Sequence, residues 1–251
     1  MNRDEQRDEG AGQALLERVR VVLVRTSHPG NIGAAARAMK TMGLQRLYLV
    51  QPQQFPDPVA DARASGADDV LAAATVVSSL QEALQDVVMA AALTARRREL
   101  SVPPMQARDA APHLLSQARN GDVALVFGAE TSGLTNEEVM LCTLPVSIPA
   151  NPAFSSLNLG AAVQLLCYEL RMAAQLPGAA LPEAPPLASF DEIEGFHAHL
   201  ERAMLASGFY DPANPRRLLP KVRRLFGRVG LERDEVNILR GILSALEKRR
   251  G

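Results

Sequence analysis

Four polar side chains gather where a predicted strand passes into a predicted helix. They are Asn151, Ser155, Ser156 and Asn158, and the helix is predicted over residues 156–174. An ordinary helix start needs one Ser or Asn side chain as its cap. The additional side chains, together with the unpaired backbone N–H groups of a first helical turn, indicate a site for a polar ligand. A well-capped helix without a ligand is the simpler interpretation of one such turn taken alone.

Arg37 is the cation whose surroundings favour a binding role. It lies six residues after Asn31 in a helix predicted over residues 31–42, with Asn31 as its cap and Gly43 after its last turn. Its neighbours are alanine and methionine, and the small alanines let another backbone approach closely. An arginine in this position can hold a phosphate group. The alternative is a side chain that only reaches water along the helix surface.

Three polar turns of this kind cover residues 26–33, 127–134 and 148–158, and each follows a predicted strand. Apolar, β-branched strands alternate with amphipathic helices along the first 175 residues, which predicts an α/β fold with a mostly parallel sheet covered on both faces. Ligands bind such sheets at the carboxyl ends of the strands, where these turns lie. The strands are predicted over residues 19–25, 46–50, 87–93, 122–127 and 144–148.

The chain divides into four segments by composition. Residues 1–17 are predicted to be a disordered tail, and residues 18–175 form the α/β domain. Residues 176–189 contain four prolines and are predicted to be a semi-rigid linker. Residues 190–251 are predicted to be a small all-helical domain, with helices over residues 190–207, 214–229 and 233–249.

Charge is distributed unevenly along the chain. The net charge of the 251 residues is −1, but residues 201–251 carry 12 Lys and Arg against 6 Asp and Glu. The tail therefore has a net charge of +6, and the rest of the chain has −7. This asymmetry indicates a basic face that can meet phosphates. A solvated charged helix without a ligand explains the same charges equally well.

Several classes of protein do not fit the sequence. It has two cysteines, Cys142 and Cys167, with no CxxC motif or His/Cys cluster, so neither a metal site nor a disulfide framework is expected. No apolar run approaches a membrane span, and the polar N-terminal segment is not a signal peptide, so a cytoplasmic location is expected. Neither GxGxxG nor a P-loop motif is present. The four histidines are interpreted as structural.

Taken together, the three turns resemble the motifs of the SPOUT superfamily of knotted RNA methyltransferases, in the group that methylates the ribose 2′-hydroxyl. The match is closest to the bacterial tRNA (cytidine/uridine-2′-O-)-methyltransferases, which modify the first nucleotide of the anticodon loop. Each motif alone is weak, but their order along nearly the whole chain is specific. The similar segments are residues 31–39 with Gly43, 127–138, 148–159, 205–209, 223–226 and 237–243. Ala129 departs from the Arg, Pro or Asn expected at its position.

The resemblance implies a fold, a cofactor and partners. The carboxyl half of the α/β domain is expected to form a deep trefoil knot that binds S-adenosylmethionine. The protein is expected to be a homodimer in which both subunits contribute to each active site, with tRNA as its partner and no metal. The residues expected to line the cofactor pocket are Leu93, Thr94, Ala95, Gly128, Ile148, Ser155, Ser156 and Leu157.

The resemblance also implies an activity, which is methylation of the ribose 2′-hydroxyl of cytidine or uridine at tRNA position 32. Arg37, Ser156 and Asn31 are the expected catalytic residues, and Glu130 is expected to brace the knot loop or to contact the cofactor ribose. A methyltransferase acting on ribosomal RNA and a catalytically silent RNA-binding protein of the same fold remain alternatives. The residues expected to contact RNA are Arg37, Arg216, Arg217, Lys221, Arg223 and Arg224.

Overall fold

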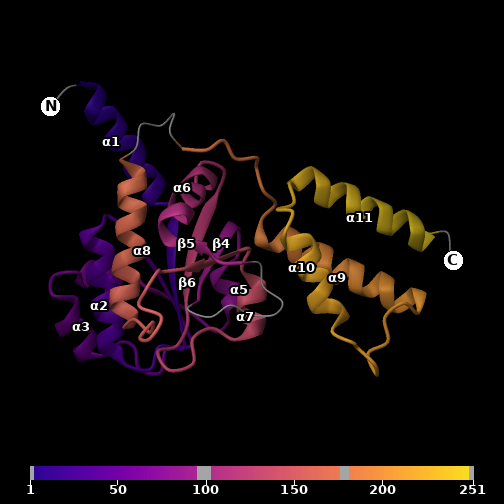
Figure 1. Ribbon diagram of the computed structural model, residues 1–251, viewed down its shortest axis with the longest axis horizontal. Coiled ribbons are helices and arrows are strands. Elements are labelled where there is room, and N and C mark those ends of the chain that lie inside the picture. The colour runs from indigo at the N-terminus through magenta and orange to yellow at the C-terminus, as the bar shows by residue number, and fades with distance from the viewer. Residues whose placement is uncertain (1–2, 95–102, 176–180, 249–251) are drawn as a thin grey trace.

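The computed structural model describes residues 3–94, 103–175 and 181–248. An α/β unit occupies one side of the molecule, and a unit of three helices occupies the other (Figure 1). The α/β unit is built on a seven-stranded, all-parallel sheet with the order β3-β2-β1-β6-β4-β7-β5. The predicted fold class is therefore confirmed. The strands are β1 (Val19–Val24), β2 (Arg46–Val50), β3 (Thr75–Val77), β4 (Val87–Leu93), β5 (Met105–Gln106), β6 (Asp122–Phe127) and β7 (Leu144–Ser147).

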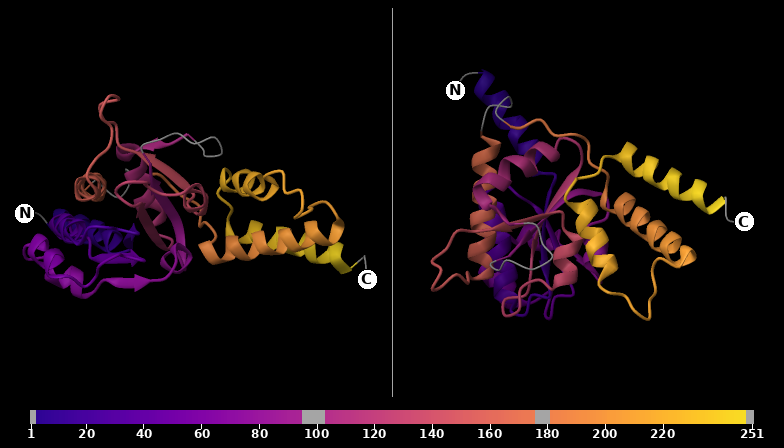
Figure 2. Two further views of the ribbon diagram at one scale, coloured as in Figure 1. Left: turned by 90° about the horizontal axis from the view of Figure 1, so that it is seen from below. Right: turned by 45° about the vertical axis from the view of Figure 1, so that its right-hand side comes forward.

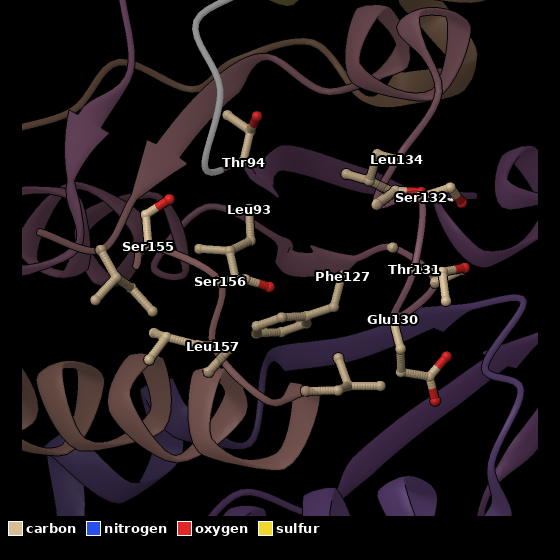
Figure 3. Close-up of a pocket in the computed structure, with 16 residues that line it drawn as sticks. Leu93, Thr94, Phe127, Glu130, Thr131, Ser132, Leu134, Ser155, Ser156 and Leu157 are labelled. Atoms are coloured by element: carbon tan, nitrogen blue, oxygen red, sulfur yellow. Dashed lines mark hydrogen bonds between the residues drawn. The ribbon is translucent and has the colours of Figure 1, made fainter. Parts of the chain in front are cut away.

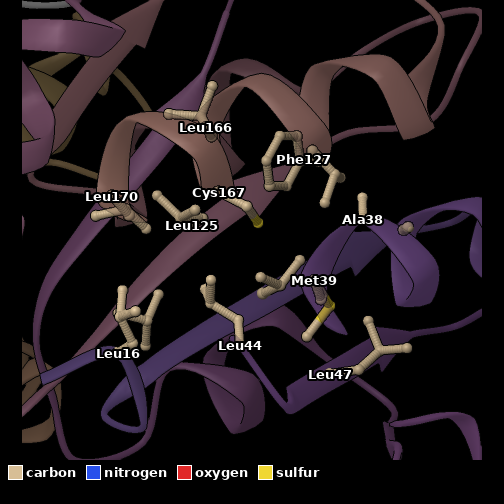
Figure 4. Packing of buried hydrophobic residues seen from close by; sticks show 14 of the residues in the cluster. Leu16, Ala38, Met39, Leu44, Leu47, Leu125, Phe127, Leu166, Cys167 and Leu170 are labelled. Carbon is tan, nitrogen blue, oxygen red and sulfur yellow. The ribbon is translucent and has the colours of Figure 1, made fainter. Parts of the chain in front are cut away.

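Helices cover both faces of the sheet. Alternate residues of β1 divide between the two faces, with Val21 and Leu23 packing in one core and Val22 and Val24 in the other. Figure 4 shows part of the larger core. Its helices are α1 (Arg3–Leu16), α2 (Pro29–Thr41), α3 (Pro58–Ala64), α4 (Asp68–Ala72), α6 (Ala107–Gln117) and α8 (Leu159–Ala174). The other face carries α5 (Leu80–Ala83) and α7 (Asn136–Leu141).

The prediction of a disordered tail over residues 1–17 is wrong for the part that the structure describes. Helix α1 ends at Leu16, whose side chain is fully buried in the larger core. Gln13 donates from Nε2 to the carbonyl oxygen of Gly43 at 2.9 Å and accepts from Arg171 at 3.1 Å. These contacts fix the end of α1 against the turn after α2 and against α8.

Both helices predicted beside the polar turns begin at other residues than predicted, and the helix predicted over residues 214–229 begins at Leu218. Helix α2 begins at Pro29 and is capped by His28, whose Nδ1 accepts from the backbone N–H of Gly30 at 3.0 Å. Asn31 therefore lies inside the helix and is not its cap. Helix α8 begins at Leu159, three residues later than predicted, so the preceding serines lie in the turn before the helix.

The three helices of the second unit are α9 (Phe190–Ser207), α10 (Leu218–Gly227) and α11 (Arg233–Lys248). They enclose a small core, which includes Phe196. Phe190 packs against the second core of the α/β unit, and the Asp191 carboxylate accepts from the backbone N–H of Asp86 at 2.8 Å. Figure 2 shows the two units in contact from two further directions. The first turn of α9 therefore docks the helical unit onto the sheet.

Strand β4 lies between β6 and β7 in the sheet. Their carboxyl ends are therefore neighbours, and the turns that follow them meet at one edge. The threading of these segments into a trefoil knot stays a prediction from the resemblance. Within the described residues, no helix has the length and apolar character to cross a membrane.

Candidate active site

A pocket lies where the turns after β4, β6 and β7 meet. Its floor is apolar, and polar side chains lie at its edge. In Figure 3, Leu93, Phe127 and Ser156 lie near the middle, with Ser155 on one side and Glu130 on the other. Ala95 lies outside the described residues. The other residues that the sequence analysis expected around a cofactor all line the pocket, namely Leu93, Thr94, Gly128, Ile148, Ser155, Ser156 and Leu157.

Gly128 is required by the fold of its own turn. A Cβ at this position would lie 2.2 Å from the carbonyl carbon of Gly133 and 2.2 Å from the backbone nitrogen of Leu134. The turn closes there because Gly133 donates its backbone N–H to the carbonyl oxygen of Ala129 at 2.8 Å. The steric requirement for glycine at this position therefore comes from the turn itself.

Glu130 accepts hydrogen bonds from the turn after β1. Its carboxylate accepts from the backbone N–H and the hydroxyl of Ser27 at 3.0 and 2.9 Å, and from the backbone N–H of His28 at 3.3 Å. The Asn31 amide donates to it at 2.8 Å. Partial burial opposes ionisation, but these hydrogen bonds lower the pKa of Glu130 to about 2. Glu130 is thus a fixed anion that ties the second turn to the first.

Asn31 extends this link to the third turn. Its Oδ1 accepts from the side-chain amide of Asn158 at 3.1 Å. Asn158 in turn caps α8, because its Oδ1 accepts from the backbone N–H of Gly160 at 2.9 Å. A chain of hydrogen bonds from Glu130 through Asn31 to Asn158 therefore joins all three polar turns. The resemblance placed Asn31 in the site, but neither partner of its side chain was expected.

Arg37 does not line this pocket. Its side chain is exposed on α2 and makes no hydrogen bond or ion pair with any residue that the structure describes. The small residues near it let helices pack closely, since a Cβ on Gly160 of α8 would lie 2.8 Å from the Cβ of Ala34. The structure thus brings Asn31 and Ser156 towards one site and leaves the Arg37 guanidinium available on the surface.

The basic residues expected to contact RNA fall into two groups. Arg223 is held by Glu194 of α9 in a two-point ion pair, with one Nη2–Oε2 distance of 2.7 Å. This pair fastens α10 to α9, so Arg223 already has a structural role. The exposed group consists of Arg216, Arg217, Lys221 and Arg224.

The sequence analysis missed two parts of the site. The pocket floor includes Phe127, Leu134 and Leu159, for which strand and helix periodicity gives only a buried position. A second ion pair joins Arg25 to Glu138, whose carboxylate also accepts from the backbone N–H of Thr135 at 2.7 Å. The T-x-x-E spacing of a capping box was the available signal for this second contact. Among the described residues, no group of His, Cys, Asp and Glu could hold a metal ion.

Two families match different parts of the chain. The SpoU rRNA methylase family matches residues 18–168, and the C-terminal domain of the tRNA methyltransferase TrmJ matches residues 191–251. The tRNA (cytidine/uridine/adenosine-2′-O-)-methyltransferase TrmJ of Pseudomonas aeruginosa (strain UCBPP-PA14) is 50% identical over 246 residues, which cover 93% of this chain and 95% of that protein. The tRNA (cytidine/uridine-2′-O-)-methyltransferase TrmJ of Pectobacterium atrosepticum is 46% identical, with 93% and 98% covered.

A solved structure agrees with these matches. The crystal structure of TrmJ from Z. mobilis ZM4 superimposes with a TM-score of 0.80 at 36% identity, over 91% of this chain and 98% of that chain. Both units of the chain, and not the sheet alone, are therefore shared with proteins of this kind. The chain belongs to the SpoU methylase family and, within it, to the TrmJ group of methyltransferases.

Proposed function

We propose that this protein transfers the methyl group of S-adenosylmethionine to the ribose 2′-hydroxyl of cytidine or uridine at position 32 of tRNA. The observation that carries the proposal is the pocket formed by the turns after β4, β6 and β7, to which Glu130, Asn31 and Asn158 join the polar turn after β1. The similarity to curated tRNA 2′-O-methyltransferases over 93% of the chain supports the substrate and the reaction. Position 32 rests on the resemblance of the motifs.

The residues of the pocket fit S-adenosylmethionine. Its apolar part, which includes Phe127 and Leu159, suits the adenine ring, and the lining also offers the side chains of Thr94, Ser155 and Ser156. When bound, the cofactor supplies a methyl group on a positively charged sulfur, which is already electrophilic. The protein therefore has to bind, orient and exclude water, and to accept one proton from the attacking hydroxyl.

We assign Arg37 and Ser156 to contacts with the nucleotide whose 2′-hydroxyl accepts the methyl group. An arginine stays protonated in proteins, so Arg37 is suited to hold the phosphate beside the ribose through two hydrogen bonds and is not suited as a base. Ser156, which lines the pocket, can polarise the 2′-hydroxyl or pass on its proton. Glu130 is a weak candidate for the base, because a pKa of about 2 gives its carboxylate little affinity for a proton.

A homodimer accounts for the separation of Arg37 from the pocket of its own chain. Large apolar side chains are exposed around the start of α8, with exposed fractions of 81% for Phe154, 40% for Leu157, 39% for Leu165 and 43% for Tyr168. Leu165 and Tyr168 lie on one face of the helix, since they are three residues apart. Packing this face against a second copy would bury it and would let Arg37 of one subunit serve the pocket of the other.

Transfer of labelled methyl groups to unmodified tRNA tests the function. The protein is mixed with S-adenosylmethionine and total tRNA that lacks ribose methylation, and the product is mapped by nuclease digestion. We expect 2′-O-methylcytidine and 2′-O-methyluridine at position 32. In the cell, we expect the protein to act in the cytoplasm, where tRNA is modified. Transfer to ribosomal RNA and not to tRNA would favour the first alternative. Cofactor and RNA binding without transfer to either would favour the silent RNA-binding protein.

A further inference from the structure

The turn after α9 presents an aromatic ring to solvent. Phe209 has an exposed fraction of 71%, whereas Phe196, in the core of the same unit, is 1% exposed and packs edge-on against Phe226. Leaving a large ring in water forgoes the stabilisation that burial gives. Single exposed apolar side chains are common and carry no function by themselves. The geometry of the turn and the charges beside it supply the further evidence.

The backbone around Phe209 is held in place. Gly208 ends α9 in the left-handed region, with φ of +73° and no atom near the position of a Cβ. The hydroxyl of Ser207 donates to the carbonyl oxygen of Met204 at 2.9 Å and accepts from the backbone N–H of Phe209 at 3.4 Å. The backbone N–H of Tyr210 donates to the same carbonyl at 3.1 Å. An ordered turn therefore presents the ring, which lowers the entropy lost on binding a partner.

Cations follow in the same loop. Arg216 and Arg217 are exposed immediately before α10, and Lys221 and Arg224 are exposed on its surface. Within the described part of the chain, neither Lys221 nor Arg224 has an ion-pair or hydrogen-bond partner for its side chain. Proteins that bind single-stranded RNA combine cations for the phosphates with aromatic rings on which unpaired bases stack. The loop has both components.

The loop also lies on the side of the molecule where a bound RNA would pass. In Figure 1 and in the right-hand view of Figure 2, the α9–α10 connection and the turn that follows β6 both extend at the lower edge, whereas the turn after β7 projects to the side in the right-hand view of Figure 2. Those turns form the pocket. A tRNA whose acceptor ribose sits at the pocket can thus extend towards the loop.

We propose that the α9–α10 loop, residues 208–217, and the first turn of α10 form a second RNA contact, in which Phe209 stacks on an unpaired base of the tRNA and Arg216 and Lys221 hold the adjacent phosphates. The inference rests on the proposed function, because it takes tRNA as the RNA. Stacking accepts any base, so this contact contributes affinity and positioning without reading sequence.

A fluorescence experiment tests the stacking directly. The chain contains no tryptophan, so the full-length Phe209→Trp variant carries a single indole. We expect unmodified tRNA to quench its emission and a fully base-paired RNA duplex of equal length to quench it far less. Val76→Trp is the matched control, since Val76 is 53% exposed on β3, and its emission should stay unchanged. Equal quenching of the two tryptophans, or by the two RNAs, would overturn the proposal.

Kinetics provide the second test. Phe209→Ala should raise the KM for tRNA about tenfold, in line with the loss of one stacked base, while kcat and the KM for S-adenosylmethionine stay near the wild-type values. Phe209→Tyr, which keeps the ring, should restore the KM. An unchanged KM in a folded Phe209→Ala variant overturns the loop contact and leaves the proposed function standing. A wild-type protein that methylates no tRNA overturns the proposed function, and this inference with it.

Discussion

Glu130 illustrates how a single charged residue organises this site. Four hydrogen bonds from Ser27, His28 and Asn31 converge on its carboxylate and hold its pKa at about 2. An anion held so firmly is suited to fix the geometry of its neighbours and is unsuited to accept a proton during turnover. Glu130 is therefore a positioning residue, which holds Asn31 of the first turn where it also bonds to Asn158 of the third.

Replacing Glu130 should make stability depend less on pH. The folded-state pKa lies below the ordinary value of 4.5, so the stabilisation is present above that value and is lost as the pH falls towards 2. We expect Glu130→Gln to lower the free energy of unfolding by about 1–2 kcal/mol at neutral pH, towards the lower end of the range for hydrogen bonds to a charged group because solvent screens a partly exposed carboxylate. The difference from wild type should shrink as the pH falls below 4.5.

Urea unfolding at a series of pH values measures this difference. Glu137→Gln is the control, because Glu137 is exposed on neighbouring α7. A Glu130→Gln variant with wild-type stability at neutral pH would show that the four hydrogen bonds do not stabilise the turns.

Removal of Arg37 should separate chemistry from cofactor binding. The side chain is exposed, so Arg37→Ala should fold and bind S-adenosylmethionine as the wild type does. We expect kcat to fall by about 10²–10³-fold, the loss typical when one charge-stabilising donor is removed. Arg37→Lys should recover little, because an ammonium cannot form the two parallel hydrogen bonds of a guanidinium. Single-turnover methyl transfer, with Lys40→Ala as a control that retains turnover, checks the result.

The order of the motifs along the sequence located most residues of the site, but it did not identify the hydrogen bonds between their side chains. The sequence placed Gly128, Ile148 and Ser156 at strand ends, and the structure brings them to one pocket. It did not predict the bond between Asn31 and Glu130, because 99 residues separate them and their register depends on how β1 and β6 pair. Tertiary geometry, and not local propensity, decides such contacts.

Among the elements, the turn after β6 depends most on one position. Gly128→Ala places a methyl group within 2.2 Å of the backbone of Gly133 and Leu134, so the turn has to open. We expect the Kd for S-adenosylmethionine to rise at least about tenfold, equivalent to about 1.4 kcal/mol. Calorimetric titration of the variant with S-adenosylmethionine measures this Kd. Gly133→Ala is the control, because its φ of +68° strains an alanine without any clash; equal losses in the two variants would contradict the steric explanation.

The elements that could be predicted are those with strong periodicity and clear ends. The expected strands over residues 87–93 and 122–127 and the expected helix over residues 190–207 agree with β4, β6 and α9 to the residue. Helix α1 was missed because its sequence is mostly polar, and its anchor, Leu16, is buried only through contacts with distant parts of the chain. Helix α8 starts late because Asn158, and not the earlier serines, caps it.

At the scale of the whole molecule, the shared active site can be tested by complementation. Arg37→Ala removes the side chain that we assign to the phosphate of the acceptor nucleotide, and Gly128→Ala distorts the cofactor pocket. If Arg37 serves the pocket of the partner subunit, mixed dimers of the two variants contain one intact site and regain turnover that neither variant has alone. Co-expression with two affinity tags isolates the mixed dimer for assay. Inactive mixed dimers would place Arg37 and the pocket of one chain in the same site.

The same interface predicts the oligomeric state. Leu165→Glu introduces a charge on the exposed apolar face of α8 and should yield a folded monomer with little activity, as light scattering after gel filtration and the transfer assay would report. Val76→Glu, which introduces the same charge at an apolar side chain that is 53% exposed on β3, is the control and should stay dimeric. A dimeric Leu165→Glu protein would contradict the assignment of this face.

Sequence could not settle how the two units meet. The proline-rich segment indicated a linker, and nothing in the helical pattern showed whether the tail folds onto the sheet. The structure answers through Phe190, which is partly buried against the second core, and Asp191, which binds the backbone at the start of β4. Such docking depends on the complementarity of two folded surfaces, which no local pattern encodes.

The most direct test of the account is methyl transfer to a tRNA that carries a single 2′-deoxynucleotide at position 32. This substrate lacks only the proposed acceptor hydroxyl and keeps every base and phosphate. The account predicts that labelled S-adenosylmethionine gives no incorporation into it, while the matched all-ribose tRNA is methylated and both bind with similar affinity. Undiminished incorporation into the deoxy-substituted tRNA would contradict the assignment of the 2′-hydroxyl at position 32 as the acceptor.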